Sequence, residues 1–599
     1  MNARIMRGQG KKFNFDKVEI EKGTTKKVIK RVWQYLKHYP SLIVIVSLSI
    51  VFSVGFNLTL PILLKIAIDD YLKVDSINMI AISLIVVSII IGGIVVSISN
   101  FFQQFLMAKV SSLVSTSIRR DAFENLVNLP ISYFDKNPHG VIMSNLTNDV
   151  ETITTALSQV VPQFITALAS IIGSIVLMLI TSWRLSIVAF LIIPLMIIGT
   201  VFISKKASKH FQLQQVKLGT INGIVKENIN GLKVVKLYNQ EDAMKNQFLS
   251  ASRQLQRASF KGQTYSGLMM PLIRLVDNVL YAMLVTVGAI LKINYGYVSV
   301  GQIQAMTNYT KLSTRPINSI AQVYNLIQIA IAGGDRVFKL IDETDEYIKE
   351  NNKLTDIKGE VEFRNVNFGY NETKLVLNNV SFKAEKGKTI AIVGPTGGGK
   401  TTIINLLMRF YDTTFGSILI DGVDINSLSK DYLRRQIGIV LQTTYLFRGT
   451  VLENIKYGKA DATIEEVIEA AKQAHVHEII NRLPRKYDTH VKEGGSNFSH
   501  GERQLLSIAR TILSNPKILV LDEATSSVDT RTESNIQKSI NSIVKNRTSF
   551  VIAHRLQTIR NADTIIVIKD GQIYEKGNHQ ELLDKKGFYY EMYQSQFNL

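Results

Sequence analysis

The sequence predicts a membrane α-helical bundle of six transmembrane helices with long cytosolic extensions, followed by an α/β P-loop domain. Three observations lead to this fold class. Long segments of the first half contain no charged residue, the net positive charge is concentrated beside those segments, and the second half carries a phosphate-binding loop among alternating strand-like and helix-like runs. A single small module is excluded, because 599 residues are several times the size of one.

Four segments without Asp, Glu, Lys or Arg have the length of membrane spans: 40–64, 76–108, 152–183 and 185–204. About 20 apolar residues suffice to cross a bilayer. Two further segments, 268–291 and 300–332, are each interrupted by two charged residues. We therefore predict six spans. Buried core helices are the alternative, which the length of the second and third segments disfavours.

The basic charge of the chain is local. Lys and Arg number 69 against 49 Asp and Glu, for a net charge of +20. Residues 1–39 and 205–266 each hold 11 basic and 3 acidic residues, so they supply 16 of the 20 net charges. Basic residues beside membrane spans follow the positive-inside rule, and we expect no nucleic-acid partner. The sequence has no cysteine, which excludes a disulfide framework, a thiolate zinc site and a cysteine nucleophile.

The connections between the segments predict the topology. Three are short and two are long: 65–75, 181–184 and 292–299 against 109–151 and 205–266. The positive-inside rule places the amino terminus and the basic segment 205–266 in the cytoplasm, and six spans return the carboxyl terminus to that side. Residues 1–30 contain no apolar stretch with a cleavage site, so we expect no removable signal peptide.

The composition changes after about Gly334, where charged residues become frequent. Runs such as VEFRNVNFGY, TIAIVG and KILVLD alternate with TIEEVIEAAKQA, the pattern of an α/β domain. The predicted organisation is a cytosolic amino-terminal segment (1–32), a six-helix transmembrane domain (33–333), a polar linker (334–358) and the α/β domain (359–599).

The strongest motif is GPTGGGKT, which fits G-x-x-x-x-G-K-[ST] and lies between a strand-like and a helical run. Glycines let backbone N–H groups surround phosphate oxygens, and the helix amino terminus adds positive potential. We expect Lys400 to meet the outer phosphates and Thr401 to offer its hydroxyl to magnesium. The α/β domain is thus predicted to bind nucleotide through Gly394, Pro395, Thr396, Gly397, Gly398, Gly399, Lys400, Thr401 and Thr402.

Two adjacent carboxylates follow an aliphatic run later in the chain. In KILVLDEATSSVD, a predicted buried strand leads to Asp522 and Glu523. Asp522 is a candidate magnesium ligand, and Glu523 a candidate to accept a proton from an attacking water or to orient it. Alone, this pattern more often marks a strand and a solvated turn. The phosphate loop in the same domain favours the catalytic interpretation.

From Trp33 to its carboxyl terminus the chain resembles ATP-binding cassette (ABC) exporters of the half-transporter type. Besides the phosphate loop and LDEATSSVD with Asp529, five motifs follow the order of that family: FGY with Tyr370, IGIVLQ with Gln442, KEGG with Glu493, FSHGE with Ser499, Gly501 and Glu502, and VIAHR with His554. The segments LPISYFDKNPHG and GTINGIVKENINGLKVVKLYNQE resemble the two coupling helices of the family.

The resemblance implies ATP as the nucleotide, with Tyr370 stacked on adenine and magnesium held by Thr401, Gln442 and Asp522. It also implies that Glu523 and His554 are catalytic. Nucleotide domains of the family pair head to tail, so Ser499, Gly501 and Glu502 are expected to contact the ATP of a partner chain. The implied location is the plasma membrane of a bacterial cell, multi-pass, with both termini and the nucleotide-binding domain in the cytoplasm.

The signature segment differs from the LSGGQ usual in the family. His500 replaces a glycine where backbone approaches phosphate, and Glu502 adds a carboxylate near an anionic ligand. Lys492 and Gly494 stand where the family commonly has Gly and Arg. We expect a heterodimer with a second ABC half-transporter subunit, in which this chain supplies Glu523 to the hydrolysing site. A homodimer with a tolerated signature variant is the alternative.

Two features of the membrane half bear on the transported compound. Asp277 either attracts a cationic compound or pairs with Arg274 one helical turn earlier, and the pair is favoured. Polar residues of the sixth segment either line a pathway or support helix packing: Gln302, Gln304, Asn308, Tyr309, Asn325 and Gln328.

The leading expectation is ATP-driven outward transport of amphipathic or hydrophobic small molecules, of the multidrug type, in contact with membrane lipids. The alternatives are a lipid flippase or a peptide exporter with the same motor and, in a different class, an ATP-gated channel or regulatory receptor. Glu523 argues against a purely nonhydrolytic role, because such proteins can dispense with a carboxylate that orients water.

Overall fold

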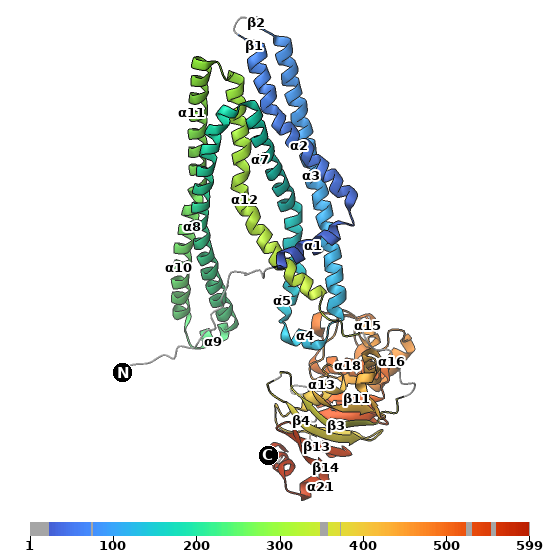
Figure 1. The fold of residues 1–599 in the computed structure, drawn as a ribbon. Coiled ribbons are helices and arrows are strands. Elements are labelled where there is room, and N and C mark those ends of the chain that lie inside the picture. The colour runs from blue at the N-terminus through green and yellow to red at the C-terminus, as the bar shows by residue number, and fades with distance from the viewer. Residues whose placement is uncertain are drawn as a thin grey trace, which may run out of the picture. The chain divides into compact units, whose positions relative to one another are not determined.

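The computed structural model describes residues 23–73, 76–347, 357–371, 373–522, 530–552 and 559–597. The chain divides into two compact units (Figure 1). The first comprises Met1–Val127 and His139–Glu343, and the second comprises Asn128–Pro138 and Thr344–Leu599. The domain boundaries expected at residues 33, 334 and 359 stay predictions.

The first unit is helical. Its elements are α1 (Thr24–Leu36), α2 (Pro40–Ile66), η1 (Ala67–Tyr71), the short strands β1 (Leu72–Lys73) and β2 (Ser76–Ile77), α3 (Met79–Val127), α5 (His139–Ser144), η2 (Asn145–Asp149), α6 (Val150–Thr155), η3 (Ala156–Val160), α7 (Val161–Thr181), α8 (Trp183–Asn230), α9 (Leu232–Leu237), α10 (Glu241–Gly267), α11 (Met269–Tyr295) and α12 (Val300–Ile341). The elements η1, η2 and η3 are wide π turns within longer helical rods.

Among the described residues, five helical rods are long and apolar enough to cross a membrane: Pro40–Tyr71, Met79–Val127, His139–Thr181, Trp183–Asn230 and Glu241–Tyr295. Taken in order, they cover the first five predicted spans except for residues 76–78 and 182–183. The sixth predicted span forms α12, a continuous helix of 42 residues that is not one of these five. Its polar residues and the charges of Lys311 and Arg315 make it less apolar than the others.

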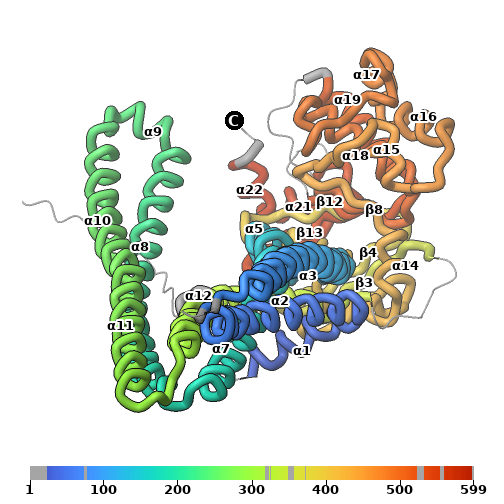
Figure 2. Tube along the Cα trace, turned by 90° about the horizontal axis from the view of Figure 1, so that it is seen from above, coloured from blue at the N-terminus to red at the C-terminus, as the bar shows by residue number. Residues whose placement is uncertain are grey.

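The predicted long extensions are continuations of the spans rather than irregular loops. The helix α3 continues 18 residues past Lys109 to Val127, and α8 continues to Asn230. Two views show α8 lying along α10 and α11 (Figures 1 and 2). Lys217 of α8 donates a hydrogen bond to the side-chain oxygen of Gln254 of α10 at 2.7 Å. These polar rods therefore stabilise each other where the chain is no longer apolar.

Two polar residues of the sixth segment support helix packing. Tyr309 is fully buried, and its hydroxyl donates to the carbonyl oxygen of Leu58 at 3.1 Å. The side chain of Gln302 accepts from the Ser299 N–H and donates to the carbonyl oxygen of Thr181 at 2.9 Å. Of the two interpretations left open by the sequence, packing is correct for these two residues.

The second unit contains two main sheets. The larger has the strand order β14-β13-β5-β12-β11-β8 and the smaller β4-β3-β6-β7. Neighbours from β13 to β8 are parallel, β14 is antiparallel, and the smaller sheet is antiparallel. The strands are β3 (Val361–Phe368), β4 (Leu377–Ala384), β5 (Thr389–Val393), β6 (Phe415–Ile420), β7 (Val423–Asp424), β8 (Ile437–Val440), β11 (Ile518–Asp522), β12 (Thr548–Ile552), β13 (Thr564–Lys569) and β14 (Gln572–Gly577), with β9 (Gly449–Thr450) paired to β10 (His490–Val491).

The helices of the second unit alternate with these strands. They are α4 (Ile131–Lys136), α13 (Lys400–Leu407), α14 (Lys430–Gln436), α15 (Val451–Lys456), α16 (Ile464–Gln473), α17 (His477–Asn481), α18 (His500–Ser514), α19 (Thr530–Val544), α21 (His579–Asp584) and α22 (Phe588–Phe597). All five residues of β12 and the first four of β11 are buried. Such continuous burial is typical of parallel strands covered on both faces, and it explains the aliphatic run of β11, Ile518–Leu521.

Candidate nucleotide-binding site

The predicted site residues gather at one edge of the larger sheet. The strand β5 leads directly to Gly394, β11 ends at Asp522, and β8 ends two residues before Gln442. These strands are parallel, with β12 between β5 and β11. Ligands of open parallel sheets bind outside the carboxyl ends of the strands. The topology therefore brings three separate sequence motifs to the edge where a nucleotide is expected.

The phosphate loop has a backbone that glycine alone adopts easily. Gly394 and Gly399 have φ angles of 147° and 107°. A Cβ atom at Gly394 would overlap the carbonyl oxygen of Ile568, and one at Gly399 would lie 2.6 Å from the side chain of Leu377. The loop thus lies close to β13 and β4. The Gly398 N–H donates to the carbonyl oxygen of Pro395 at 3.1 Å, and the other N–H groups at the start of α13 are the candidates to meet phosphate oxygens.

Lys400 lies at the centre of this loop. Its ammonium donates to the carbonyl oxygens of Gly394 and Pro395 at 2.9 and 3.0 Å, and the residue is only 9% exposed. Burial lowers the pKa of Lys400, and the negative charge of Asp522 acts in the opposite direction. Thr401 is exposed whereas Thr402 is buried. The hydroxyl of Thr401 is therefore the more accessible of the two.

Tyr370 is held beside the helix that follows the loop. Its hydroxyl lies 3.3 Å from the Thr402 hydroxyl and accepts a hydrogen bond from Asn405 at 3.0 Å. The ring of Tyr411 meets the ring of Tyr370 edge to face at 5.0 Å. Tyr370 is 39% exposed. An oriented, partly exposed ring suits stacking on a base, the role that the sequence predicted.

Part of the long connection 109–151 belongs to this unit. Residues 131–136 form α4, within the segment that resembles the first coupling helix. The Tyr411 hydroxyl donates to the carboxylate of Asp135. Burial raises the pKa of Tyr411, and the hydrogen bond to Asp135 raises it further. Tyr411 therefore lies between α4 and Tyr370, bonded to Asp135 through its hydroxyl and in contact with Tyr370 through its ring.

We expect Tyr411→Phe to weaken coupling between ATP turnover and transport severalfold while leaving the Kd for ATP unchanged. The ring stays in contact with Tyr370, but the hydrogen bond to a charged group, worth about 1.5–3 kcal/mol, is lost. The measurement is the ratio of transport to ATP hydrolysis in proteoliposomes, with Tyr574→Phe, an exposed tyrosine, as the control. A changed ATP affinity with an unchanged ratio contradicts this role.

The signature segment caps a helix. Ser499 precedes α18, its hydroxyl accepts from the Glu502 N–H at 3.3 Å, and the Glu502 carboxylate accepts from the Ser499 N–H at 2.8 Å. This reciprocal arrangement explains how an acid is accommodated at residue 502. The Nδ1 atom of His500 is buried without a hydrogen-bond partner among the described residues.

The role of the signature residues toward a nucleotide stays a prediction. Across the described ranges, no hydrogen bond joins Ser499, Gly501 or Glu502 to the phosphate loop. Both residues predicted to be catalytic, Glu523 and His554, lie outside the residues that the structure describes. The strands β11 and β12 end one and two residues before them.

The oxygen donors at the sheet edge fit magnesium. Thr401 and Gln442 are exposed, and Asp522 is partly exposed. No group of three or more His, Cys, Asp or Glu side chains that could hold a metal occurs in the described part of the chain. Magnesium usually takes one or two carboxylates and completes its coordination with phosphates and water. The residues present therefore suit a metal that arrives with nucleotide.

The first unit contains a polar cavity of about 800 Å³ that the sequence analysis missed. It lies between α3, the η3–α7 rod and α12, and Arg315 and five amide side chains line it: Asn100, Gln103, Gln104, Gln159 and Gln163. Within the two longest uncharged segments these amides recur three or four residues apart, which places them on one helix face. That spacing was the signal available in the sequence.

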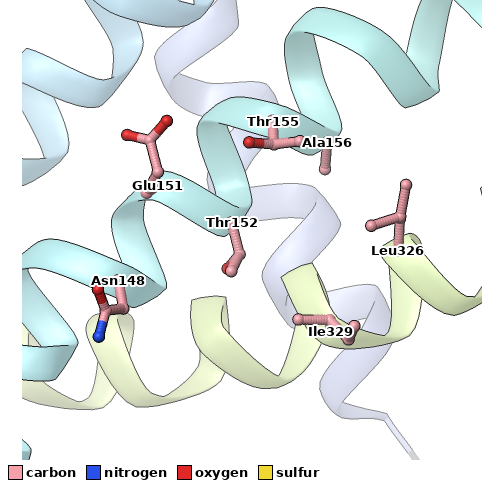
Figure 3. A pocket seen from close by; sticks show the side chains of 7 residues that line it. All are labelled: Asn148, Glu151, Thr152, Thr155, Ala156, Leu326 and Ile329. Carbon is pink, nitrogen blue, oxygen red and sulfur yellow. The ribbon is translucent and has the colours of Figure 1, made fainter.

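A smaller cavity of about 300 Å³ lies between α6 and α12 (Figure 3). Leu326 and Ile329 contribute apolar side chains from α12, and Glu151 points away from α12. Glu151 pairs with Arg119 at 3.3 Å. This cavity therefore presents little chemistry for a ligand.

The groups that act on the carboxylate of Asp277 belong to α12 and not to its own helix, α11. The side chains that interact with it are Thr314, Lys311 and Arg315. Asp277 and Arg274 are both described, and they form no ion pair. The favoured interpretation of the sequence, a pair within one helix, was wrong, because two basic residues of α12 lie near the carboxylate.

Membrane-length apolar helices and a P-loop α/β unit on one chain define a transport ATPase of the membrane. The family described as ABC transporter transmembrane region matches residues 43–317, and the family described as ABC transporter matches residues 377–526. The chain belongs to the ABC transporter family. It is a membrane-integral exporter of the half-transporter type that binds ATP and couples its hydrolysis to transport.

Several known proteins are similar over most of their length. An uncharacterized ABC transporter ATP-binding protein of Bacillus subtilis, YfiC, is 39% identical over 98% of this chain and 99% of its own. A fatty acid ABC transporter ATP-binding/permease protein of Mycobacterium bovis is 41% identical over 79% of this chain and 75% of its own. An ATP-dependent lipid A-core flippase of Syntrophus aciditrophicus is 34% identical over 95% of this chain and 94% of its own.

The fold also matches a solved structure. A bacterial Atm1-family ABC exporter with ATP bound has a TM-score of 0.77 and 29% identity, and the match covers 93% of this chain and 98% of that one. The predicted family and fold class are therefore confirmed.

Proposed function

We propose that this chain exports amphipathic or hydrophobic small molecules as one subunit of a dimer. The observation that carries the proposal is the phosphate loop at the carboxyl edge of a parallel sheet, on the same chain as five membrane-length helices. ATP closure of paired nucleotide units opens the path outward, and hydrolysis resets it. The basic segments flanking the spans support cytoplasmic termini and a cytoplasmic nucleotide unit, and the similar proteins support a bacterial plasma membrane.

In this proposal each residue of the site has one task. Tyr370 stacks on adenine, Lys400 and the loop N–H groups hold phosphates, and Glu523 orients the attacking water. Magnesium, when bound with ATP through Thr401, Gln442 and Asp522, neutralises phosphate charge. His554 contacts the γ-phosphate.

A heterodimer is the favoured assembly. His500 puts a side chain where the family has glycine, whereas the phosphate loop retains all its motif residues. This asymmetry supports a partner subunit with a degenerate nucleotide site beneath the altered signature. In that arrangement the partner supplies the intact signature to the ATP held by this chain.

The test is the assembly and activity of the chain expressed alone. We expect the isolated chain in nanodiscs to bind ATP but hydrolyse it at least about tenfold more slowly than the pair formed with its partner subunit, since one chain lacks a complete intact site. Light scattering gives the assembly and phosphate release gives the rate. A stable homodimer with full ATPase and transport activity contradicts the heterodimer.

A lipid flippase is the second candidate function. The printed names of two relatives, a fatty acid transporter and a lipid A-core flippase, support a lipid-like amphiphile. Flipping and export use the same motor and differ in where the compound is released. A fluorescent lipid that changes leaflet without leaving the vesicle membrane distinguishes them.

A further inference from the structure

The lining of the larger cavity is rich in hydrogen-bond donors. Besides the five amides, the hydroxyls of Ser158, Thr166 and Ser170 reach it. The Thr166 hydroxyl is buried without a hydrogen-bond partner among the described residues. The amide oxygen of Asn100 accepts from Ser53 at 2.8 Å, which leaves its NH₂ group as the donor. Polar groups at membrane depth usually face a cavity with a function.

The charges around this cavity are unbalanced. Arg315 lines it, and none of the lining residues whose side chains the structure describes is acidic. Asp277 of α11 is a neighbouring carboxylate, and the positive charges of both Lys311 and Arg315 act on it. Two basic residues therefore lie near one carboxylate. A cationic ligand would increase this imbalance, whereas an anionic group would neutralise it.

The cavity lies at the end of the spans where their charged flanks begin. On α3 the amides at 100, 103 and 104 precede Lys109, the first charge after the apolar run. On the facing rod, Gln159 and Gln163 follow Glu151 at the start of the next run. Both flanks belong to the same long connection, 109–151. Under the proposed topology this is the cytoplasmic end, level with the head groups of the inner leaflet.

We propose that this cavity binds the anionic head group, a carboxylate or a phosphate, of an amphiphile taken from the inner leaflet. Arg315 supplies the opposite charge, and the amides and the Thr166 hydroxyl donate hydrogen bonds to the oxygens. Charge-assisted bonds of this kind are the strong ones in a site of low dielectric. The inference rests on the proposed function and names its substrate class.

The test compares three probes with one chain length: palmitate, hexadecanol and hexadecyltrimethylammonium. Binding to the exporter in phosphatidylcholine nanodiscs is measured by equilibrium dialysis. We expect palmitate to bind tighter than the other two, and Arg315→Gln to raise its Kd at least about tenfold, the loss of one charge-assisted contact. Arg315→Lys restores part of the affinity, and Thr166→Val, which keeps the shape, weakens palmitate binding severalfold.

The matched control is Arg257→Gln, an exposed arginine of α10 outside the cavity, which should leave palmitate affinity unchanged. Equal affinity for the three probes overturns the head-group site. An unchanged Kd for palmitate in a folded Arg315→Gln variant overturns it as well. Displacement of palmitate by millimolar inorganic phosphate, with the same dependence on Arg315, overturns the assignment to an amphiphile in favour of a free anion.

Transport measurements separate this inference from the proposed function. ATP-dependent export of cationic amphiphiles that is unaffected by Arg315→Gln overturns the head-group site and leaves the exporter intact. Arg315-dependent palmitate binding without ATP-dependent movement of any amphiphile overturns the proposed export instead.

Discussion

Replacing Glu523 with glutamine should slow steady-state ATP hydrolysis by roughly two or more orders of magnitude and leave ATP binding intact. An amide can no longer accept a proton from water, and loss of a positioned general base has this scale. The residues expected to hold phosphates, Lys400 and the loop glycines, are unchanged. The measurements are phosphate release and the Kd for a fluorescent ATP analogue in nanodiscs, with the partner subunit present.

The control for this variant is Glu533→Gln, which removes a carboxylate from α19 of the same unit. It should hydrolyse ATP at the wild-type rate. Unchanged hydrolysis in Glu523→Gln would rule out the assigned role. A parallel loss of ATP affinity would indicate instead that Glu523 supports nucleotide binding.

The second large effect is expected at Glu346, whose side chain is only 3% exposed. Its carboxylate accepts from Arg434 at 2.7 Å and pairs with Lys430 at 3.3 Å, and both cations are largely buried. Glu346→Gln removes the carboxylate charge that these two largely buried cations share. Breaking such a cluster costs about 3–5 kcal/mol. We expect the melting temperature of the second unit to fall by roughly 6 °C or more.

Calorimetry of the detergent-solubilised chain measures this effect. Glu343→Gln, an exposed carboxylate three residues earlier, is the control and should change the melting temperature little. A further variant, Glu346→Gln with Arg434→Met, also removes one of the two positive charges and should recover part of the lost melting temperature. An unchanged melting temperature in the single variant would show that Glu346 is not needed for stability.

Sequence reasoning succeeded where one local pattern determines one local structure. The uncharged runs became helices because their length and composition suit a bilayer, and GPTGGGKT became a strand–loop–helix turn because its glycines occupy left-handed φ angles. The aliphatic run before Asp522 became a strand buried on both faces. In each case neighbouring residues in the sequence carry the physical cause.

The missed features depend on contacts between distant elements. Asp277 was assigned to Arg274, but its real neighbours are about 35 residues away on α12. The amides of the polar cavity come from segments that were selected only for their lack of charged residues, so their uncharged polar side chains were not considered. The bond between Tyr411 and Asp135 joins residues 276 positions apart. No local pattern encodes such distances, and only the packing of the helices and strands brings these side chains together.

The inclusion of residues 128–138 in the second unit has a consequence for biosynthesis. The helix α4 leaves the ribosome before 205 further residues of the first unit, His139–Glu343, have been made. At synthesis rates of about 5–20 residues per second, the 276 positions between Asp135 and Tyr411 correspond to roughly 14 s or longer before the tyrosine is made. The second unit is therefore completed only after the whole first unit has been synthesised. The helix α4 is made early, but it acquires its partner late.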